Sequence, residues 1–221
     1  MEQGDEAWLQ QRESLVATAS VLGEALGVGY GSVQKFLEEK WAKVRKAPSW
    51  IMLEGQKREP YVRWLFMSLL PHFTLELPAL GVLAEDPRFG GSPDGILTHK
   101  ETGERYLLEV KTRPGQPEMR EEIPVTHLLQ MLLLCRIYDL VAAYYICSTY
   151  DVGLQVAHVS FKPELWPEIY RRMRLLALMY EKGVKPKKQA AGDREKLTSF
   201  IREHTVITSI PEIESKMPPG E

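Results

Sequence analysis

Hydrophobic residues recur along this chain with two different periods. Trp166, Ile169 and Met173 follow the three-to-four-residue spacing of a helix that packs one face. Between residues 105 and 111, apolar and polar side chains alternate as in a strand. Helices are expected at 8–12, 20–26, 32–45, 51–70, 124–138, 164–180 and 195–203, and strands at 74–77, 81–84, 95–98, 106–112, 141–147 and 154–161. This mixture predicts an α/β fold.

The strand that contains a Glu-Val-Lys triplet carries the first candidate chemistry. A period of two sends Tyr106, Leu108 and Val110 to the core. Glu109 and Lys111 then project together from the opposite face. A carboxylate and a lysine therefore share one side of this strand.

A second acid, Asp94, lies in a Ser-Pro-Asp-Gly turn 15 positions before Glu109. The intervening Thr-Gly pair is a turn signal, so a hairpin would fold Asp94 back against Glu109. Converging carboxylates suit Mg²⁺ or Mn²⁺, and the thiols or paired histidines that zinc prefers are missing here. In the alternative, Asp94 belongs to an ordinary turn and the strand charges are solvated. The order and spacing of these motifs favour a metal site for cutting phosphodiesters.

The pattern Pro93-Asp94 followed by Glu109-Val110-Lys111 resembles the core of the PD-(D/E)xK nucleases. The resemblance implies an α/β fold, namely a restriction-endonuclease-like core with a mixed central β-sheet flanked by helices. Three further blocks resemble the lambda-exonuclease-like and YqaJ-type viral recombinase nucleases, and with this core they span about the first 135 residues in family order. These blocks are Trp8 to Arg12 with a Thr-Ala-Ser segment ending at Ser20, Gly55 followed by Glu59, and Gln130.

The family resemblance implies roles for the acids and the lysine. Asp94 and Glu109 would be metal ligands, together with the main-chain carbonyl of Val110. Glu59 would complete a second metal position or orient a water molecule, so two Mg²⁺ or Mn²⁺ ions are implied. Lys111 would position or deprotonate the attacking water, or neutralise charge on the phosphate. In the alternative, Glu59 is a charge on a helix surface.

Three further residues would act on the substrate. Arg12 and Ser20 resemble the phosphate-binding pair of the family, although Arg12 lies eight residues before Ser20, one more than in the lambda-type pattern. A small bulge would absorb the difference. In the alternative, Arg12 is a surface arginine and Ser20 a helix cap. Gln130, in an otherwise apolar helix, would be catalytic through a metal-bound water or the substrate, or would bond a loop carbonyl.

Length and composition bound the domain organisation. The 221 residues are 44% hydrophobic and 26% charged, as in an ordinary globular protein. We expect a nuclease domain over 1–184 and a polar C-terminal segment, a linker plus a short helix, over 185–221. Two cysteines, Cys135 and Cys147, predict packed thiols and exclude the iron–sulfur relatives, which need four. Without a secretory signal or a long apolar run, we expect an intracellular protein, cytoplasmic or nuclear, that binds no membrane.

The net charge of −2 hides an uneven distribution of basic residues. They cluster at residues 40–46, at 171–174 and at 182–188, so a local positive groove could bind DNA. The alternative is a set of solvated helix faces, which is favoured for residues 40–46.

The sequence therefore predicts a metal-dependent deoxyribonuclease that hydrolyses double-stranded DNA, as a 5′-to-3′ exonuclease in recombination or replication. An endonuclease, or a DNA/RNA nuclease of the viral alkaline-nuclease type, is the alternative within the class. A non-catalytic DNA-binding module is the alternative from another class. The expected partners are double-stranded DNA and a single-strand annealing or recombination protein. The resemblance leaves open whether the chain is a monomer or a trimer.

Overall fold

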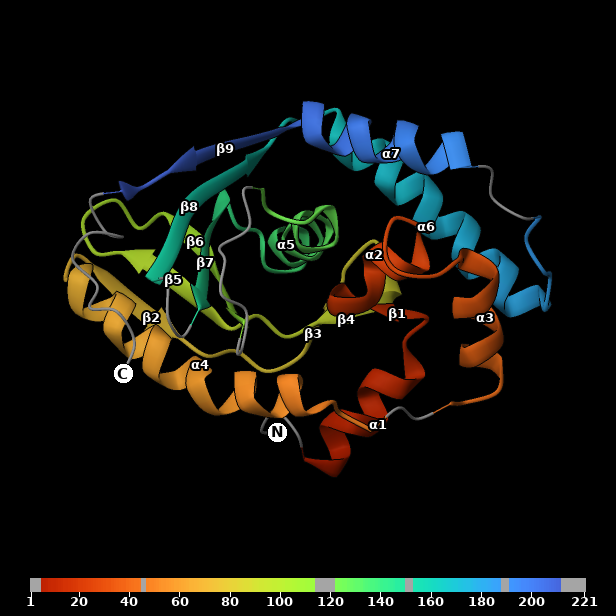
Figure 1. Ribbon diagram of the computed structural model, residues 1–221, viewed down its shortest axis with the longest axis horizontal. Coiled ribbons are helices and arrows are strands. Elements are labelled where there is room, and N and C mark those ends of the chain that lie inside the picture. Colours follow the sequence, from red (N-terminus) through yellow and green to blue (C-terminus); the bar gives the residue numbers. More distant parts are fainter. Residues whose placement is uncertain (1–4, 45–46, 114–121, 150–152, 188–190, 212–221) are drawn as a thin grey trace.

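A mixed six-stranded sheet forms the centre of the computed structural model, which describes residues 5–44, 47–113, 122–149, 153–187 and 191–211 (Figure 1). The strand order is β2-β5-β6-β7-β8-β9, and β6 and β7 run parallel while the other neighbours are antiparallel. Its strands are β2 (Phe73–Glu76), β5 (Gly95–His99), β6 (Arg105–Arg113), β7 (Ala142–Thr149), β8 (Gly153–Phe161) and β9 (Thr205–Ser209).

A small second sheet joins the N-terminal part of the chain to its middle. It has the order β1-β4-β3, formed by β1 (Ala17–Thr18), β4 (Asp86–Gly91) and β3 (Gly81–Leu83). The β1 strand runs parallel to β4, so residues that follow the first helix are held beside a segment about 70 positions later.

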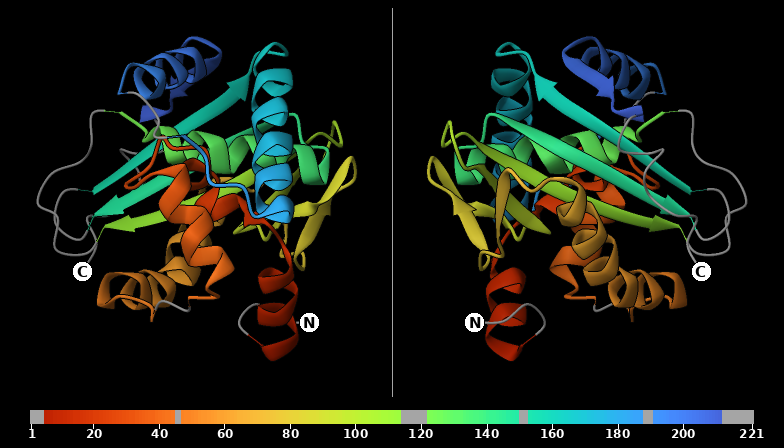
Figure 2. Two further views of the ribbon diagram at one scale, coloured as in Figure 1. Left: turned by 90° about the vertical axis from the view of Figure 1, so that its right-hand side faces the viewer. Right: turned by 90° about the vertical axis from the view of Figure 1, so that its left-hand side faces the viewer.

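Helices cover both faces of the central sheet. The helices are α1 (Glu6–Ser14), α2 (Leu22–Ala25), α3 (Val33–Trp41), α4 (Trp50–Leu69), α5 (Val125–Tyr138), α6 (Leu165–Lys182) and α7 (Ala191–Glu203), with a 3₁₀ turn η1 (Ala19–Val21) before α2. Helix α5 is apolar on all sides because the sheet and other helices surround it. Helix α4 packs on the opposite face, and Figures 1 and 2 show α4 and α7 on opposite sides of the molecule. No helix in the described ranges is long and apolar enough to span a bilayer.

Strand β6 is buried on both faces. Leu107 contributes to the core around α5, whereas Leu108 and Val110 contribute to the core beneath α4. The alternation expected from the sequence holds, but Glu109 points into a second covered layer and has no exposed surface. Solvated charge at Glu109 is therefore the wrong interpretation.

The expected helices and strands are present with shifted ends, and two segments differ more. Helix α3 ends at Trp41 and not at residue 45, because Ala42 caps it and Lys43 adopts a left-handed φ of 50°. Residues 20–26 form η1 followed by the short α2. Strands β1, β4 and β9 are not predicted by the sequence pattern.

The C-terminal part packs on the same core as the rest. Helix α7 buries Leu197 and Ile201 in the core around α5, and β9 extends the sheet beside β8. The division of the chain at residue 184 stays a prediction. The sequence also predicts a loop at residues 114–117 and a turn at residues 150–153; the loop and residues 150–152 of the turn lie outside the described residues.

Candidate metal and phosphate site

The β5–β6 hairpin brings Asp94 next to the Glu-Val-Lys triplet. Gly95 pairs with Leu108, so Asp94 lies one position beyond the ladder, beside the end of β6. The Val110 amide donates a hydrogen bond of 2.7 Å to Asp94 Oδ2. Burial raises the pKa of Asp94, although Lys111 and the Val110 amide act against this change. The convergence expected from the spacing of the two acids is present.

Among the described residues, the fully buried Glu109 has one cationic partner, Lys111. Neither of its two buried carboxylate oxygens accepts a hydrogen bond of acceptable geometry from any described residue. Its Oε1 forms an ion pair with the Lys111 ammonium. Burial raises the pKa of Glu109 to about 8, with Asp94 and Glu59 acting in the same direction and Lys111 against them. A buried carboxylate in this state is stabilised by a cation placed against its open oxygens.

Helix α4 brings a third acid, Glu59, to this pair. A Cβ on Gly55 would lie 2.6 Å from Thr112 Oγ1, so only glycine lets α4 approach β6 this closely. Glu59 follows one helical turn later on the same face. Burial and then Asp94 raise the pKa of Glu59 to about 7, while Arg63 acts in the opposite direction. The glycine in the second sequence block therefore has a packing reason.

Two cations lie among the three acids. Arg63 Nη1 donates to Glu59 Oε1 at 2.7 Å and to the main-chain oxygen of Asp94 at 2.9 Å. Burial lowers the pKa of Lys111, but Glu109, Asp94 and Glu59 outweigh it, so the net pKa is raised. Arg63 is not among the predicted site residues, although its spacing of four from Glu59 is the signal of a helical ion pair.

Arg12 and Ser20 also meet. Arg12 Nη2 donates to Ser20 Oγ at 3.3 Å and to Thr18 Oγ1 at 3.4 Å. The guanidinium lies 4.4 Å from the centre of the Trp8 ring, and burial lowers its pKa. Trp8 Nε1 in turn donates to Ser92 Oγ, two residues before Asp94. Sequence reasoning did not assign Thr18 or Ser92 to this cluster.

Arg12 and Thr18 also line a cavity of about 460 Å³ between α1 and α3. Lys40 lies on its other side and donates to the main-chain oxygen of Glu13. Burial lowers the pKa of Lys40. Lys40 is thus a packed residue and differs from the solvated helix charge expected of its cluster.

Gln130 lies on α5 with 8% of its surface exposed. The sequence leaves open whether its amide contacts a metal-bound water, the substrate or a loop carbonyl, and its role stays a prediction.

The donor set fits a hard divalent cation. Across the described ranges, no three His, Cys, Asp or Glu side chains lie close enough together to hold a metal ion by themselves. Asp94 and Glu109 supply two carboxylates, and apart from the ion pair with Lys111 the Glu109 oxygens accept no hydrogen bond from the described residues. Oxygen ligands with this charge suit Mg²⁺ or Mn²⁺, which keep several waters and need few protein ligands. Both cysteines are buried and unpaired with each other, as expected.

The sequence of the chain matches a known protein family over the segment that carries this site. The YqaJ-like viral recombinase domain matches residues 7–134, which include every proposed site residue. No curated protein matches the amino-acid sequence of the chain. These findings confirm the family resemblance drawn from the motifs.

Two solved structures share the fold. An alkaline exonuclease from Laribacter hongkongensis, LHK-Exo, is similar with a TM-score of 0.64 and 15% identity over 90% of this chain and 99% of that one. The structure of LHK-Exo in complex with dAMP is similar with a TM-score of 0.63 and 16% identity, over 90% of this chain and 99% of that one. The restriction-endonuclease-like core with a mixed central sheet is confirmed.

Proposed function

Because this chain belongs to the YqaJ-like viral recombinase domain family, we propose that it is a metal-dependent deoxyribonuclease that degrades double-stranded DNA from an end, in the 5′-to-3′ direction. The observation that carries the proposal is the fully buried Glu109 beside Asp94, which among the described residues has the Lys111 ammonium as its ion-pair partner and accepts no other hydrogen bond. The exonuclease name of the structural relative and its complex with dAMP support the choice of reaction and substrate.

Asp94, Glu109 and the main-chain carbonyl of Val110 would hold one Mg²⁺ or Mn²⁺ ion, and Glu59 would contribute to a second. When bound, these ions supply Lewis-acid stabilisation of the charge that grows on the phosphate and on the leaving 3′ oxygen. The products would be a 5′-phosphate and a free 3′ hydroxyl.

The basic side chains of the site would bind and orient the substrate. The Lys111 ammonium keeps its charge beside the acids, so it would donate to the attacked phosphate and hold the incoming water. Arg63 would fix Glu59 and the Asp94 turn in place. Arg12 and Ser20, already within hydrogen-bond distance of each other, would bind the terminal phosphate. Gln130 would contact the substrate from α5.

The proposal is tested by digestion of linear duplex DNA with Mg²⁺ or Mn²⁺. Wild-type protein should release nucleotides, whereas Asp94→Ala and Lys111→Ala should each abolish release while circular dichroism and unfolding temperature show a folded protein. Absence of cleavage by pure wild type with either ion, or wild-type rates in both variants, contradicts a nuclease and favours a DNA-binding module.

Direction and end preference need matched substrates. Linear DNA with a 5′ phosphate should be degraded faster than the same DNA with a 5′ hydroxyl, and Arg12→Ala should remove the difference. A label at the 5′ end should be released before one at the 3′ end. Cleavage of closed circular DNA identifies an endonuclease and overturns the exonuclease assignment.

A further inference from the structure

A second cavity, of about 540 Å³, lies between α6 and α7, and its lining residues differ from the acids Glu59, Asp94 and Glu109 of the candidate metal site. We name it the α6–α7 groove; its apolar floor is formed mainly by Leu26, Leu176 and Met179, and Leu175 lies on its wall. Leu175 is 51% exposed, which is unusual for an aliphatic residue in a helix centre. None of the acids of the candidate metal site lines the groove.

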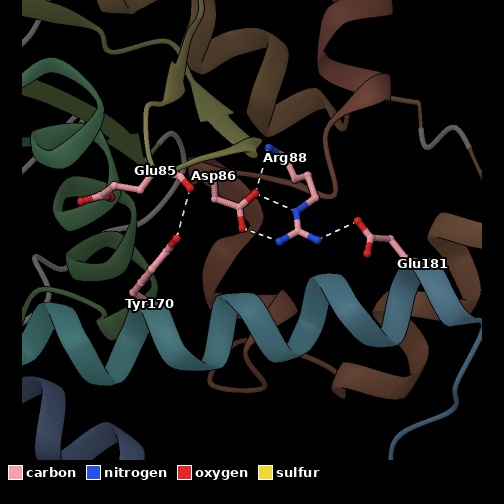
Figure 3. A network of polar contacts seen from close by, with 5 residues as sticks. All are labelled: Glu85, Asp86, Arg88, Tyr170 and Glu181. Atoms are coloured by element: carbon pink, nitrogen blue, oxygen red, sulfur yellow. Dashed lines mark hydrogen bonds and ion pairs between the residues drawn. The ribbon is translucent and has the colours of Figure 1, made fainter.

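The walls of the groove are fixed in position. The α6 wall is tied to β4, because Arg88 bridges Asp86 and Glu181, and Tyr170 Oη donates to the main-chain oxygen of Glu85 (Figure 3). A groove with fixed walls loses little conformational entropy when a ligand binds.

The other walls are tethered as well. Arg194 on α7 donates to the main-chain oxygens of Val28 and Gly29, after α2. Trp41 Nε1 at the end of α3 donates to the main-chain oxygen of Tyr180 on α6 at 2.9 Å. The groove is therefore preformed by segments that are distant in the sequence.

The rim of the groove is basic. Of the described residues, Arg172, Lys187 and Lys196 line it, together with one acid, Asp193. Arg172 is paired with Glu168, whereas Lys187 and Lys196 form no ion pair within the part of the chain that the structure describes. Two unneutralised cations above an aliphatic floor complement a ligand that is both acidic and apolar.

The lining also distinguishes between classes of ligand. Among the described residues that line the groove there is no aromatic ring, so these residues do not offer the stacking that single-stranded nucleic acids use. The volume is in the range of sites that bury side chains of a peptide or a small ligand. An extended peptide that carries carboxylates beside an aliphatic side chain satisfies both the rim and the floor.

We propose that the α6–α7 groove binds an acidic, aliphatic peptide segment of a partner protein. Carboxylates of the peptide bind Lys187 and Lys196, and a leucine-like side chain fills the floor beside Leu175. The groove leaves the acid cluster clear, so the partner and DNA can be held together. This inference goes beyond the nuclease proposal and does not depend on it.

The test is fluorescence polarisation with a short labelled peptide of glutamate and leucine, without DNA and in EDTA. Wild-type protein should bind it, with affinity that falls as salt rises. The double variant Lys187→Glu with Lys196→Glu should weaken binding by at least about tenfold, and Leu175→Asp should do the same. Lys57→Glu, the same charge change on the exposed face of α4, should leave binding unchanged.

Controls with other ligands decide the class of partner. A lysine–leucine peptide and an all-glutamate peptide should bind at least about tenfold more weakly than the mixed peptide. Binding of single-stranded or duplex DNA that is stronger than peptide binding and is weakened by the same double variant overturns the proposal in favour of nucleic acid. Sedimentation that shows an oligomer dissociated by the double variant assigns the groove to contact between copies of this chain. Because nuclease assays are run separately, failure of either proposal is recognised without the other.

Discussion

Two buried acids in this protein have opposite surroundings. Asp86, 4% exposed, accepts hydrogen bonds from the Arg88 amide and guanidinium, and these bonds lower its pKa. Glu109, with no exposed surface, accepts none of acceptable geometry from the described residues, and its pKa is raised to about 8. An acid whose charge is already satisfied stabilises the fold, whereas one left with open oxygens is available for a ligand.

The largest expected effect follows from removing the charge of Glu109. Glu109→Gln should lower the rate of DNA degradation by at least about a thousandfold, because a ligand for the cation is lost. Its unfolding temperature should not fall, since the buried charge is removed. Rates of nucleotide release and thermal unfolding measure both. Glu104→Gln, at an exposed acid of the same hairpin, is the matched control, and a similar rate loss in that variant contradicts the prediction.

The opposite result is expected at the satisfied acid. Arg88→Ala leaves Asp86 buried without its guanidinium and also removes the ion pair with Glu181, so it should cost about 2 kcal/mol of unfolding free energy. Specific activity at low temperature should be kept. Urea unfolding measures the loss. Arg171→Ala, which removes an exposed pair on α6, should cost less than about 0.5 kcal/mol. Equal losses in the two variants would mean that the Asp86 network is no more stabilising than a surface pair.

A smaller effect is expected when α4 is pushed away from the acids. Gly55→Ala places a Cβ against Thr112 Oγ1, so Glu59 should move and the rate should fall by about tenfold. The double variant with Thr112→Ala should recover part of the rate. Gly192→Ala on α7, where a Cβ would meet nothing, should keep full activity and gain about 1 kcal/mol of stability. If the double variant recovers none of the rate, the contact between residue 55 and Thr112 is not the cause of the loss.

The smallest expected effect is a pH dependence of opposite sign at the two acids. Between about pH 4.5 and 8, folded metal-free protein keeps a proton on Glu109 that the unfolded chain has released, so stability falls as pH rises. Asp86 has a lowered pKa, and its contribution is lost only as pH falls below about 3.8. Each 1 kcal/mol lost should lower Tm by roughly 2–4 °C.

Thermal unfolding in EDTA across this pH range measures the effect. Glu109→Gln should flatten the loss at high pH, and added Mg²⁺ should reverse it in wild type by binding the folded state. A Tm of wild type that is flat from pH 5 to 8 in EDTA would falsify the raised pKa of Glu109.

Much of the candidate site could be predicted because its parts are local. Asp94 and Glu109 belong to one hairpin, and alternation along β6 places Glu109 and Lys111 on the same face. Gly55 and Glu59 lie one helical turn apart. The spacing of residues within one hairpin or one helical turn is therefore enough to predict which of these side chains lie close together.

Other elements lack a local signal. Strand β4 is a run of Asp-Pro-Arg-Phe-Gly-Gly without alternation, and only its pairing with β1 and β3 makes it a strand. Strand β9 has mostly exposed side chains and is a strand because β8 offers a free edge. The contact of Arg63 with the main chain of Asp94 spans 31 residues, so no helical pattern predicts it.

The sequence by itself determined which donors this protein has and in what order: two carboxylates, a lysine and a helix-borne acid, at spacings set by one hairpin and one helical turn. Only the tertiary structure decided the state of those groups. Glu109 is shielded from solvent because two helices cover the two faces of β6: α4, which precedes β6 in the chain, and α5, which follows it. The burial of a side chain depends on contacts from the whole chain, and burial changes the free energy of a charged group. Residue spacing therefore predicts which acids are present, but it does not predict their pKa or their hydrogen-bond partners.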